Sequence, residues 1–382
     1  MKTKDRCVNL AYNAGMFLRI KGLSLMGGNI VENKGDFQGS RSRPSADGHP
    51  ETMKTTPHPD SPPLLPSPQG RGKRGRGERV RGLGSDFQSR GRLLACVLAA
   101  TLSTLLPAAA SAHTVKDQTG RVVNIPNEPH RLVSLAPNIT EIVYALGLGD
   151  ELVGDTDNCD FPPQAKNKPH VGTMVNPSLE RIVALKPDLT LGTPEANRRE
   201  TADQLERLGI PLYGVTATTL AGTLASIDDL GRILGRGAEA QSLVAEMQAR
   251  VDRVEKRIEG QPKPRVLFVV WYRPLITVGP HTFIADVIRA AGGIPIGENL
   301  KGEWPRLTLE ELLPQNPDVI LFPKTESFSP STKEFESLPG WKDLRAVKEH
   351  RMFFVSETIM RPGPRLVDAL EELANILHPA AN

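Results

Sequence analysis

The 382-residue chain has few aromatic residues and little cysteine. Aromatic residues make up 5% of the sequence, and cysteine occurs three times. Cys7 and Cys96 lie ahead of the main body of the chain, which leaves Cys159 as the only thiol of that body. One thiol can form neither an intramolecular disulfide nor a thiolate metal cluster, so both kinds of scaffold are excluded. Hydrophobic residues at 39% and charged residues at 24% exclude a polytopic membrane protein.

The short motifs that mark common enzyme sites are also missing. The sequence contains no Walker loop, no nucleophile elbow and no HExxH motif. Gly147-Leu148-Gly149 lacks the third glycine of a dinucleotide-binding loop and is interpreted as a helix end. A three-histidine metal site or a Ser-His-Asp triad assembled in space stays open, but we predict no catalytic residues and no metal site. The histidines of the body are scattered: His113, His130, His170, His281, His350 and His378.

Charge is divided unevenly along the chain. Residues 1–112 hold 17 lysines and arginines against 8 aspartates and glutamates, whereas residues 113–382 hold 30 against 36. The basic surplus therefore belongs to the N-terminal region. The acidic body gives no reason to expect nucleic-acid binding.

An apolar run at residues 93–110 has the features of an export signal. Arg90 and Arg92 precede it, and Ala110-Ser111-Ala112 follows as a small-residue cleavage site. We predict a cleavable signal peptide over 90–112 and a mature chain that starts at His113. A membrane anchor is the alternative, which Pro107 and the small-residue end disfavour. Cys96 follows too closely on Arg92 to leave an apolar stretch before a lipidation site.

Residues 1–89 have the composition of a segment without a core. Positions 57–68 contain six prolines, and positions 70–92 alternate glycine with arginine and lysine. Such a segment cannot bury enough apolar surface to fold, so we predict that it is disordered. A start codon assigned too early explains it best, with the true start around 80–90. A basic disordered arm is the alternative.

From residue 113 onward, strand patterns alternate with helix patterns at the spacing of parallel β/α units. Residues 115–126 predict a hairpin, and residues 238–259 predict a long helix that separates two series. The first series has predicted strands at 131–137, 152–157, 188–193 and 211–215, and helices at 140–148, 178–187 and 196–209. The second series has predicted strands at 265–271, 319–322 and 351–355, and helices at 282–292 and 366–377.

The two series share an internal duplication. SLERIVALKPDLTL at 178–191 aligns without gaps with TLEELLPQNPDVIL at 308–321. We therefore predict an α/β fold of two Rossmann-like lobes, 113–235 and 263–382, joined by one long α-helix at 236–262. A ligand cleft is expected between the lobes, because ligands of α/β sheets bind at the carboxyl ends of the strands.

The rare aromatic residues of the body lie where such a cleft is expected. Trp271 ends a predicted strand, and Trp304 lies in the loop before the second copy of the duplicated helix. Phe161 and Met174 lie in loops of the first lobe. These side chains suit a large, flat, partly apolar ligand. The alternative is that each tryptophan fills the core between helices and loops.

Glu180 and Glu310 occupy equivalent positions of the duplication. Ser178 and Thr308 can cap the two helices, and a glutamate in the first turn interacts favourably with the helix dipole, by about 0.3–1 kcal/mol. Alternatively, two exposed carboxylates, one per lobe, are recognised by basic residues of a partner. The residues alone leave both interpretations open.

These stretches resemble a known family. The chain is similar to the periplasmic substrate-binding proteins of ABC importers, in the cobalamin and ferric-siderophore class whose lobes are joined by a single helix. Within that class the likeness is greatest to cobalamin binders. The resemblance covers about residues 130–378. It is carried by DFPPQA (160–165), SLERIVALKPDL (178–189), EWPRLTLEEL (303–312) and RPGPRL (361–366).

The resemblance implies a set of functional residues. Met174 stands where a cobalamin binder has a tryptophan, although a methionine can still pack on a flat macrocycle. Glu180 and Glu310 match the two glutamates that, in this family, dock onto arginines of the transporter's membrane subunits. The implied ligand-contacting residues are Asn138, Phe161, Met174, Trp271, Trp304, Glu357 and Arg361.

The function implied by the resemblance is solute capture without chemistry. We expect an exported periplasmic monomer, without a cofactor, that binds cobalamin or a related corrinoid and delivers it to an inner-membrane ABC importer. The expected partners are this macrocyclic ligand and the importer's transmembrane subunits. A ferric siderophore or haem is the alternative ligand, and a metal-ion receptor is a further one. An anionic chelate would prefer cleft arginines, for which the candidates are Arg198, Arg199, Arg273, Arg306 and Arg361.

Overall fold

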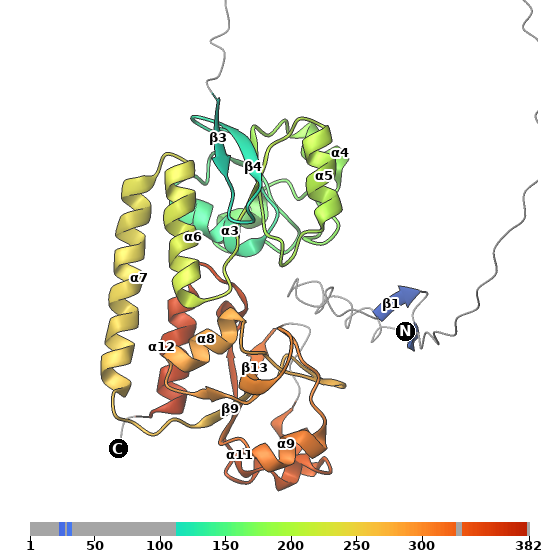
Figure 1. The fold of residues 1–382 in the computed structure, drawn as a ribbon, viewed down its shortest axis with the longest axis vertical. Coiled ribbons are helices and arrows are strands. Elements are labelled where there is room, and N and C mark those ends of the chain that lie inside the picture. The colour runs from blue at the N-terminus through green and yellow to red at the C-terminus, as the bar shows by residue number, and fades with distance from the viewer. Residues whose placement is uncertain (1–22, 27–28, 33–111, 326–330, 380–382) are drawn as a thin grey trace, which may run out of the picture. The chain divides into compact units, whose positions relative to one another are not determined.

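The computed structural model describes residues 23–26, 29–32, 112–325 and 331–379 (Figure 1). In the N-terminal region, β1 (Leu23–Met26) and β2 (Asn29–Glu32) form an antiparallel pair. This pair lies within residues 1–89, where the sequence predicts disorder. The rest of that extension lies outside the described residues, as does all of the predicted signal peptide at 90–112 except Ala112.

The first lobe is built on a four-stranded parallel sheet with the order β6-β5-β7-β8. β5 and β7 are buried along their whole length, as expected of central parallel strands. The strands and helices predicted for the first series are present, but the strands predicted at 131–137 and 152–157 end earlier, at Ser134 and Gly154. The strands are β5 (Leu132–Ser134), β6 (Leu152–Gly154), β7 (Leu189–Gly192) and β8 (Leu212–Gly214). The helices are α3 (Pro137–Ala145), α4 (Leu179–Ala184) and α5 (Arg199–Arg207), with the 3₁₀ turn η2 (Pro163–Asn167).

The second lobe repeats this arrangement with a parallel sheet of order β12-β9-β13-β14. Its strands are β9 (Arg265–Phe268), β12 (Ile294–Pro295), β13 (Val319–Lys324) and β14 (Met352–Ser356). The helices are α8 (Phe283–Ala290), α9 (Leu309–Gln315), α10 (Thr332–Ser337) and α11 (Arg345–Lys348). Three 3₁₀ turns complete it: η3 (Ile296–Asn299), η4 (Trp341–Asp343) and η5 (Glu357–Met360).

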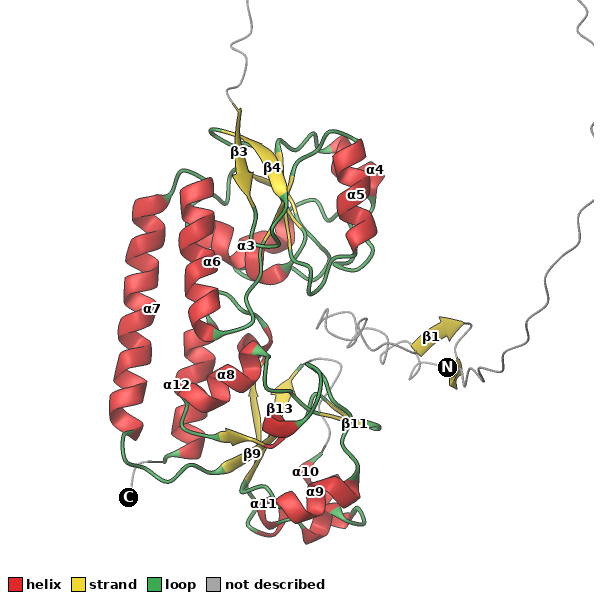
Figure 2. Ribbon diagram, in the orientation of Figure 1, coloured by secondary structure: helices red, strands yellow, loops and turns green. Residues whose placement is uncertain are grey.

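Three helices lie along one side of the two lobes, and the longest of them, α7, runs past both (Figure 2). They are α6 (Leu220–Ile233), α7 (Gly237–Ile258) and α12 (Leu366–Leu377). α7 packs against α6 in the first lobe and against α8 and α12 in the second, which confirms the predicted long helix. One apolar core extends through both lobes beside these helices. Among the residues that the structure describes, no helix is long and apolar enough to span a bilayer.

The structure confirms the internal duplication. Both sheets have the same strand order, and residues 179–186 have the same burial pattern as residues 309–316, with one buried residue each, Ile182 and Leu312. Each duplicated helix is followed within two residues by a residue with positive φ, Lys186 at 49° after α4 and Asn316 at 42° after α9. The amide of Asp188 then donates to the carbonyl of Arg131, just before β5, and the amide of Asp318 donates to the carbonyl of Arg265, the first residue of β9.

Besides the β1–β2 pair, two hairpins among the described residues lie outside the main sheets. β3 (Ala112–Lys116) and β4 (Val122–Pro126) confirm the predicted hairpin near the start of the body. β10 (Trp271–Tyr272) and β11 (Leu275–Ile276) correct the predicted strand at 265–271. That strand ends at Phe268, because the chain turns back and the amide of Val270 donates to the carbonyl of Ile276 at 2.9 Å. α3 begins three residues earlier than predicted, since a proline is well suited to the first helical position.

Candidate functional site

A cavity between the lobes is lined by segments that follow strands of the first sheet and by loops of the second lobe. The empty space in it is about 860 Å³, a figure that includes space open to solvent. Ligands of α/β proteins bind beyond the carboxyl ends of the strands, and the segments that follow the strands of the first sheet line this cavity. The predicted ligand cleft is therefore present. The residues that line it are 136–138, Met174, Thr193, 195–196, 217–218, 281–283, 303–304 and 360–362.

Four of the seven predicted ligand contacts line this cavity, namely Asn138, Met174, Trp304 and Arg361. Asn138 follows β5 and donates a 3.3 Å hydrogen bond to the carbonyl oxygen of Pro362 in the second lobe. The structure thus brings together residues that are more than 200 positions apart in the sequence. Their contact with a ligand remains a prediction.

Asn197 fixes the loop that carries Met174. Its side-chain nitrogen donates to the carbonyl oxygens of Met174 at 2.8 Å and of Leu135 at 3.0 Å, and its side-chain oxygen accepts from the amide of Thr193 at 2.7 Å. Three segments of the cavity wall are therefore held by one amide side chain. Nothing in the sequence around Asn197 indicates this role, because two of its three partners, Leu135 and Met174, lie far from it in the sequence.

The loop of Trp304 is held by a close approach of two backbone segments. The amide of Gly279 donates to the carbonyl oxygen of Glu303 at 2.8 Å. A Cβ atom at position 279 would lie 1.9 Å from the carbonyl oxygen of Gly302, so only glycine fits there. This contact places the half-buried Trp304 at the cavity wall.

The cavity has an acidic rather than a basic lining. Glu195 and Glu303 line it, and the exposed His281 contributes an imidazole. Glu195 accepts a short hydrogen bond from the hydroxyl of Thr193. Of the described residues that line the cavity, the only arginine or lysine is Arg361. No group of three or more histidine, cysteine, aspartate or glutamate side chains in the described ranges is arranged to hold a metal ion.

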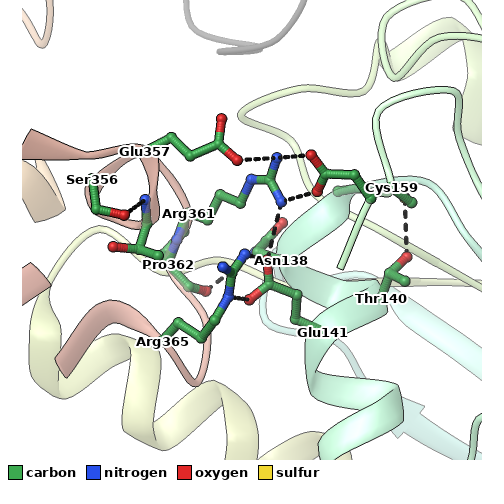
Figure 3. Close-up of polar contacts among 12 residues, drawn as sticks. Asn138, Thr140, Glu141, Cys159, Ser356, Glu357, Arg361, Pro362 and Arg365 are labelled. Atoms are coloured by element: carbon green, nitrogen blue, oxygen red, sulfur yellow. Dashed lines mark hydrogen bonds and ion pairs between the residues drawn. The ribbon is translucent and has the colours of Figure 1, made fainter. Parts of the chain in front are cut away.

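Arg361 belongs to an ion-pair network between the lobes (Figure 3). Its guanidinium donates to Glu141 at 3.2 Å, to both oxygens of Asp160 and to Glu357 at 3.3 Å. Arg365 donates to the same Glu141 carboxylate, at 2.9 Å from Nε. Glu141 is only 3% exposed, and the Arg361 side chain is 15% exposed. The positive charge of Arg361 is therefore neutralised within the protein.

The electrostatics of the network favour the charged forms. Burial raises the pKa of Asp160, but the hydrogen bonds and charge of Arg361 outweigh it, so the pKa lies below its ordinary value. Asp155, five residues before Asp160 in the chain, is another buried carboxylate. Its Oδ1 lies 2.6 Å from Nδ1 of His170. Burial raises the pKa of Asp155 to about 6, although the hydrogen bond and charge of His170 lower it in part.

Phe161, Trp271 and Glu357 do not line the cavity. Phe161 is 39% exposed in a neighbouring depression, with the Arg365 guanidinium 3.8 Å from its ring centre. Trp271 packs on its own hairpin and donates from Nε1 to the carbonyl of Arg273 at 2.8 Å. Glu357 faces Arg361 from outside the cavity. Their assignment as ligand contacts stays a prediction that the cavity geometry does not support.

Glu180 and Glu310 both lie exposed at the start of short helices, on α4 and α9. In α9 the capping box with Thr308 uses Glu311, whose carboxylate accepts from the Thr308 amide at 2.8 Å. Within the described part of the chain, neither the Glu180 nor the Glu310 side chain forms an ion pair or hydrogen bond. Capping therefore does not explain Glu310.

The structure has two α/β lobes, each built on a parallel sheet, with one helix that runs along both lobes and a cavity between them. This is the architecture of a solute-binding protein. The model of the periplasmic binding protein family matches residues 132–358, more than half of the chain, and the chain belongs to this family. The family resemblance stated from the sequence is therefore confirmed. Members of the family bind substrates and are not enzymes, and what they carry is a transported ligand rather than a cofactor.

Known proteins that are similar to this chain have names that state different ligands or none. The Bacillus subtilis ABC transporter substrate-binding lipoprotein YvrC is 33% identical over 275 residues, 70% of this chain and 85% of that protein. The vitamin B12-binding protein of Vibrio campbellii is 31% identical over 245 residues, 64% of this chain and 87% of that protein. The apo structure of the heme-binding protein RhuT from Roseiflexus sp. RS-1 superposes with a TM-score of 0.60 and 28% identity. It covers 66% of this chain and 99% of that chain.

Proposed function

We propose that this protein captures cobalamin or a related corrinoid in the cavity between its lobes and delivers it to an ABC importer. The observation that carries the ligand assignment is the cavity lining. The half-buried Trp304 offers aromatic surface for a flat macrocycle, the buried Met174 and Phe283 add apolar lining, and Glu195 and Glu303 add carboxylates. The amide groups at the edge of a corrin donate hydrogen bonds, and carboxylates accept them.

An anionic ligand fits this lining less well. The carboxylates of haem or of a ferric chelate would face Glu195 and Glu303, and Arg361 is already paired with three acidic residues. Like charges brought together in a site cost several kcal/mol. The other arginines that the sequence offers for an anionic chelate do not line the cavity: Arg198, Arg199, Arg273 and Arg306.

Haem is the second candidate ligand. The similarity to RhuT supports it, and His281 lines the cavity with an imidazole, a common ligand of haem iron. A corrinoid is favoured over haem because the vitamin B12-binding relative is similar at 31% identity and because the lining is acidic.

The ligand site is tested by a matched pair of tryptophan variants. Trp304 lines the cavity and Trp271 does not. We expect Trp304→Ala to weaken cobalamin binding about 30-fold, the effect of losing about 2 kcal/mol at a buried aromatic contact. Trp271→Ala should leave the affinity within about threefold of the wild type. Equal affinities for Trp304→Ala and the wild type, with both folded by circular dichroism, would place the ligand elsewhere.

For delivery, we propose that Glu180 and Glu310 dock onto basic residues of the importer's transmembrane subunits. The equivalent exposure of the two carboxylates and their lack of partners within the described residues support this role. Glu180→Gln/Glu310→Gln should leave cobalamin titration unchanged and impair cobalamin uptake by the reconstituted transporter. Normal uptake by this variant would reduce both glutamates to residues at helix starts.

We also propose that the protein works in the periplasm as a monomer after cleavage of the 90–112 signal peptide, with lobe boundaries at 113–235 and 263–382. The YvrC relative is a lipoprotein, which makes membrane attachment the competing arrangement. N-terminal sequencing of the exported protein should find His113 first. A mature chain that begins with a lipid-modified Cys96 would show attachment instead.

A further inference from the structure

In the part of the chain that the structure describes, few large apolar side chains are exposed. Two of these side chains occupy equivalent positions of the internal duplication. Val183 is 43% exposed and Leu313 is 38% exposed. They are separated by 130 positions, the offset of the internal duplication. The others are Val122, Phe161, Leu208 and Ile294.

Each of the pair lies one helical turn from a proposed docking glutamate. Val183 follows Glu180 by three residues on α4, and Leu313 follows Glu310 by three residues on α9. Side chains three apart are neighbours on one face of a helix. Each glutamate and its apolar neighbour therefore form one small exposed patch, the Glu180–Val183 patch in the first lobe and the Glu310–Leu313 patch in the second.

The fold does not require an apolar residue at either position. The core-facing positions of these helices are filled by Ile182 and Leu312, both fully buried. Single exposed apolar residues are common on protein surfaces and need no explanation. The repetition of the same pair, an exposed glutamate and an exposed branched apolar residue, at the same place in both lobes is what indicates a binding surface.

We propose that Val183 and Leu313 are apolar contacts with the importer, beside the two docking glutamates. The matching surface of the importer would have a basic residue next to an apolar depression. It would have this pair of features twice, once on each of two equivalent subunits. The carboxylates supply charge complementarity, and the apolar side chains supply surface that is removed from water on docking. This inference rests on the proposed delivery to an importer.

The test measures the affinity of the protein for the cobalamin importer of the source organism, reconstituted in lipid nanodiscs. The variant Val183→Ser/Leu313→Ser should bind about tenfold more weakly or worse, with an unchanged dependence on salt. Glu180→Gln/Glu310→Gln should also bind more weakly, but with a reduced dependence on salt, because it removes charge. Leu208→Ser/Ile294→Ser is the matched control, since it removes two exposed apolar side chains outside the patches. It should bind like the wild type.

The outcomes separate this inference from the proposed function. If the glutamate variant binds weakly but Val183→Ser/Leu313→Ser binds like the control, the apolar contacts are refuted and docking through glutamates stands. If the wild type does not bind the importer, the delivery role fails and this inference fails with it. Sedimentation of the protein alone should show one monomeric species for all variants. A dimer lost in Val183→Ser/Leu313→Ser would assign the patches to a second copy of the chain and refute the inference.

Discussion

Glu141 is the residue on which the ion pairs between the lobes converge, and its replacement gives a quantitative test of that network. The carboxylate is 3% exposed and accepts from Arg361 at 3.2 Å and from Arg365 at 2.9 Å. Glu141→Gln keeps the size of the side chain but removes the negative charge between the two guanidinium groups. Breaking a buried ion pair by removing one partner typically costs about 3–5 kcal/mol.

Two features of the network reduce the expected cost. Arg361 keeps Asp160 and Glu357 as acidic partners, and the Arg365 side chain is 22% exposed and can be hydrated. We therefore expect Glu141→Gln to lower the free energy of unfolding by about 2–4 kcal/mol. That loss is large for a domain whose total stability is on the order of 5–15 kcal/mol.

The measurement is urea unfolding followed by circular dichroism, with Glu371→Gln as the matched control. Glu371 pairs with Arg250 on α7, but its side chain is 38% exposed. Exposed pairs contribute about 1 kcal/mol or less, and Arg250 keeps Asp368 as a partner. Should Glu141→Gln lose no more stability than Glu371→Gln, the lobes are not held together by this network.

Two further predictions concern the cavity wall and the loop beside it. Gly279→Ala should destabilise the protein by about 1–3 kcal/mol and weaken ligand binding, because the added Cβ would displace the Gly302 carbonyl and the Trp304 loop. Thermal unfolding measures the loss of stability, and titration measures the loss of affinity. A variant with wild-type stability and affinity would contradict this prediction. Asp155 has a pKa of about 6 in the folded protein, above the 3.8 of an ordinary aspartate, so its contribution to stability falls as the pH rises from about 4 to 6. Asp155→Asn cannot titrate, so the stability of the wild type relative to this variant should fall across that interval; a constant or rising difference refutes the assignment.

The fold was largely accessible from the sequence because its elements are regular and repeated. The 3.6-residue pattern of α12 and α7, and the alternation of short apolar strands with helices, follow from which side chains face the core. The 130-residue offset also predicted two similar lobes. The prediction that Trp271 ends the strand at 265–271 is wrong, because Trp271 belongs to the β10–β11 hairpin. An apolar run shows where a strand begins more clearly than where the chain turns back, which here happens at Arg273-Pro274.

The site was less accessible, because its important contacts join distant segments. Arg361 is predicted to bond the ligand and lines the cavity, but no sequence pattern reveals that Glu141 and Asp160, about 200 residues away in the sequence, pair with it. Asn197 and Gly279 hold the cavity wall through backbone contacts that no local pattern reveals. Trp304 and Met174, by contrast, are rare large side chains in loops at strand ends, a pattern that predicts a ligand site, and both line the cavity.

The most direct test of the proposed function is calorimetric titration of the purified protein with cobalamin, cobinamide, haem and a ferric siderophore under the same conditions. An acidic cavity with a neutralised arginine should bind the corrinoids at least about 100-fold more tightly than the anionic ligands. Tight binding of haem or the ferric siderophore, with no heat from cobalamin or cobinamide, would contradict the account.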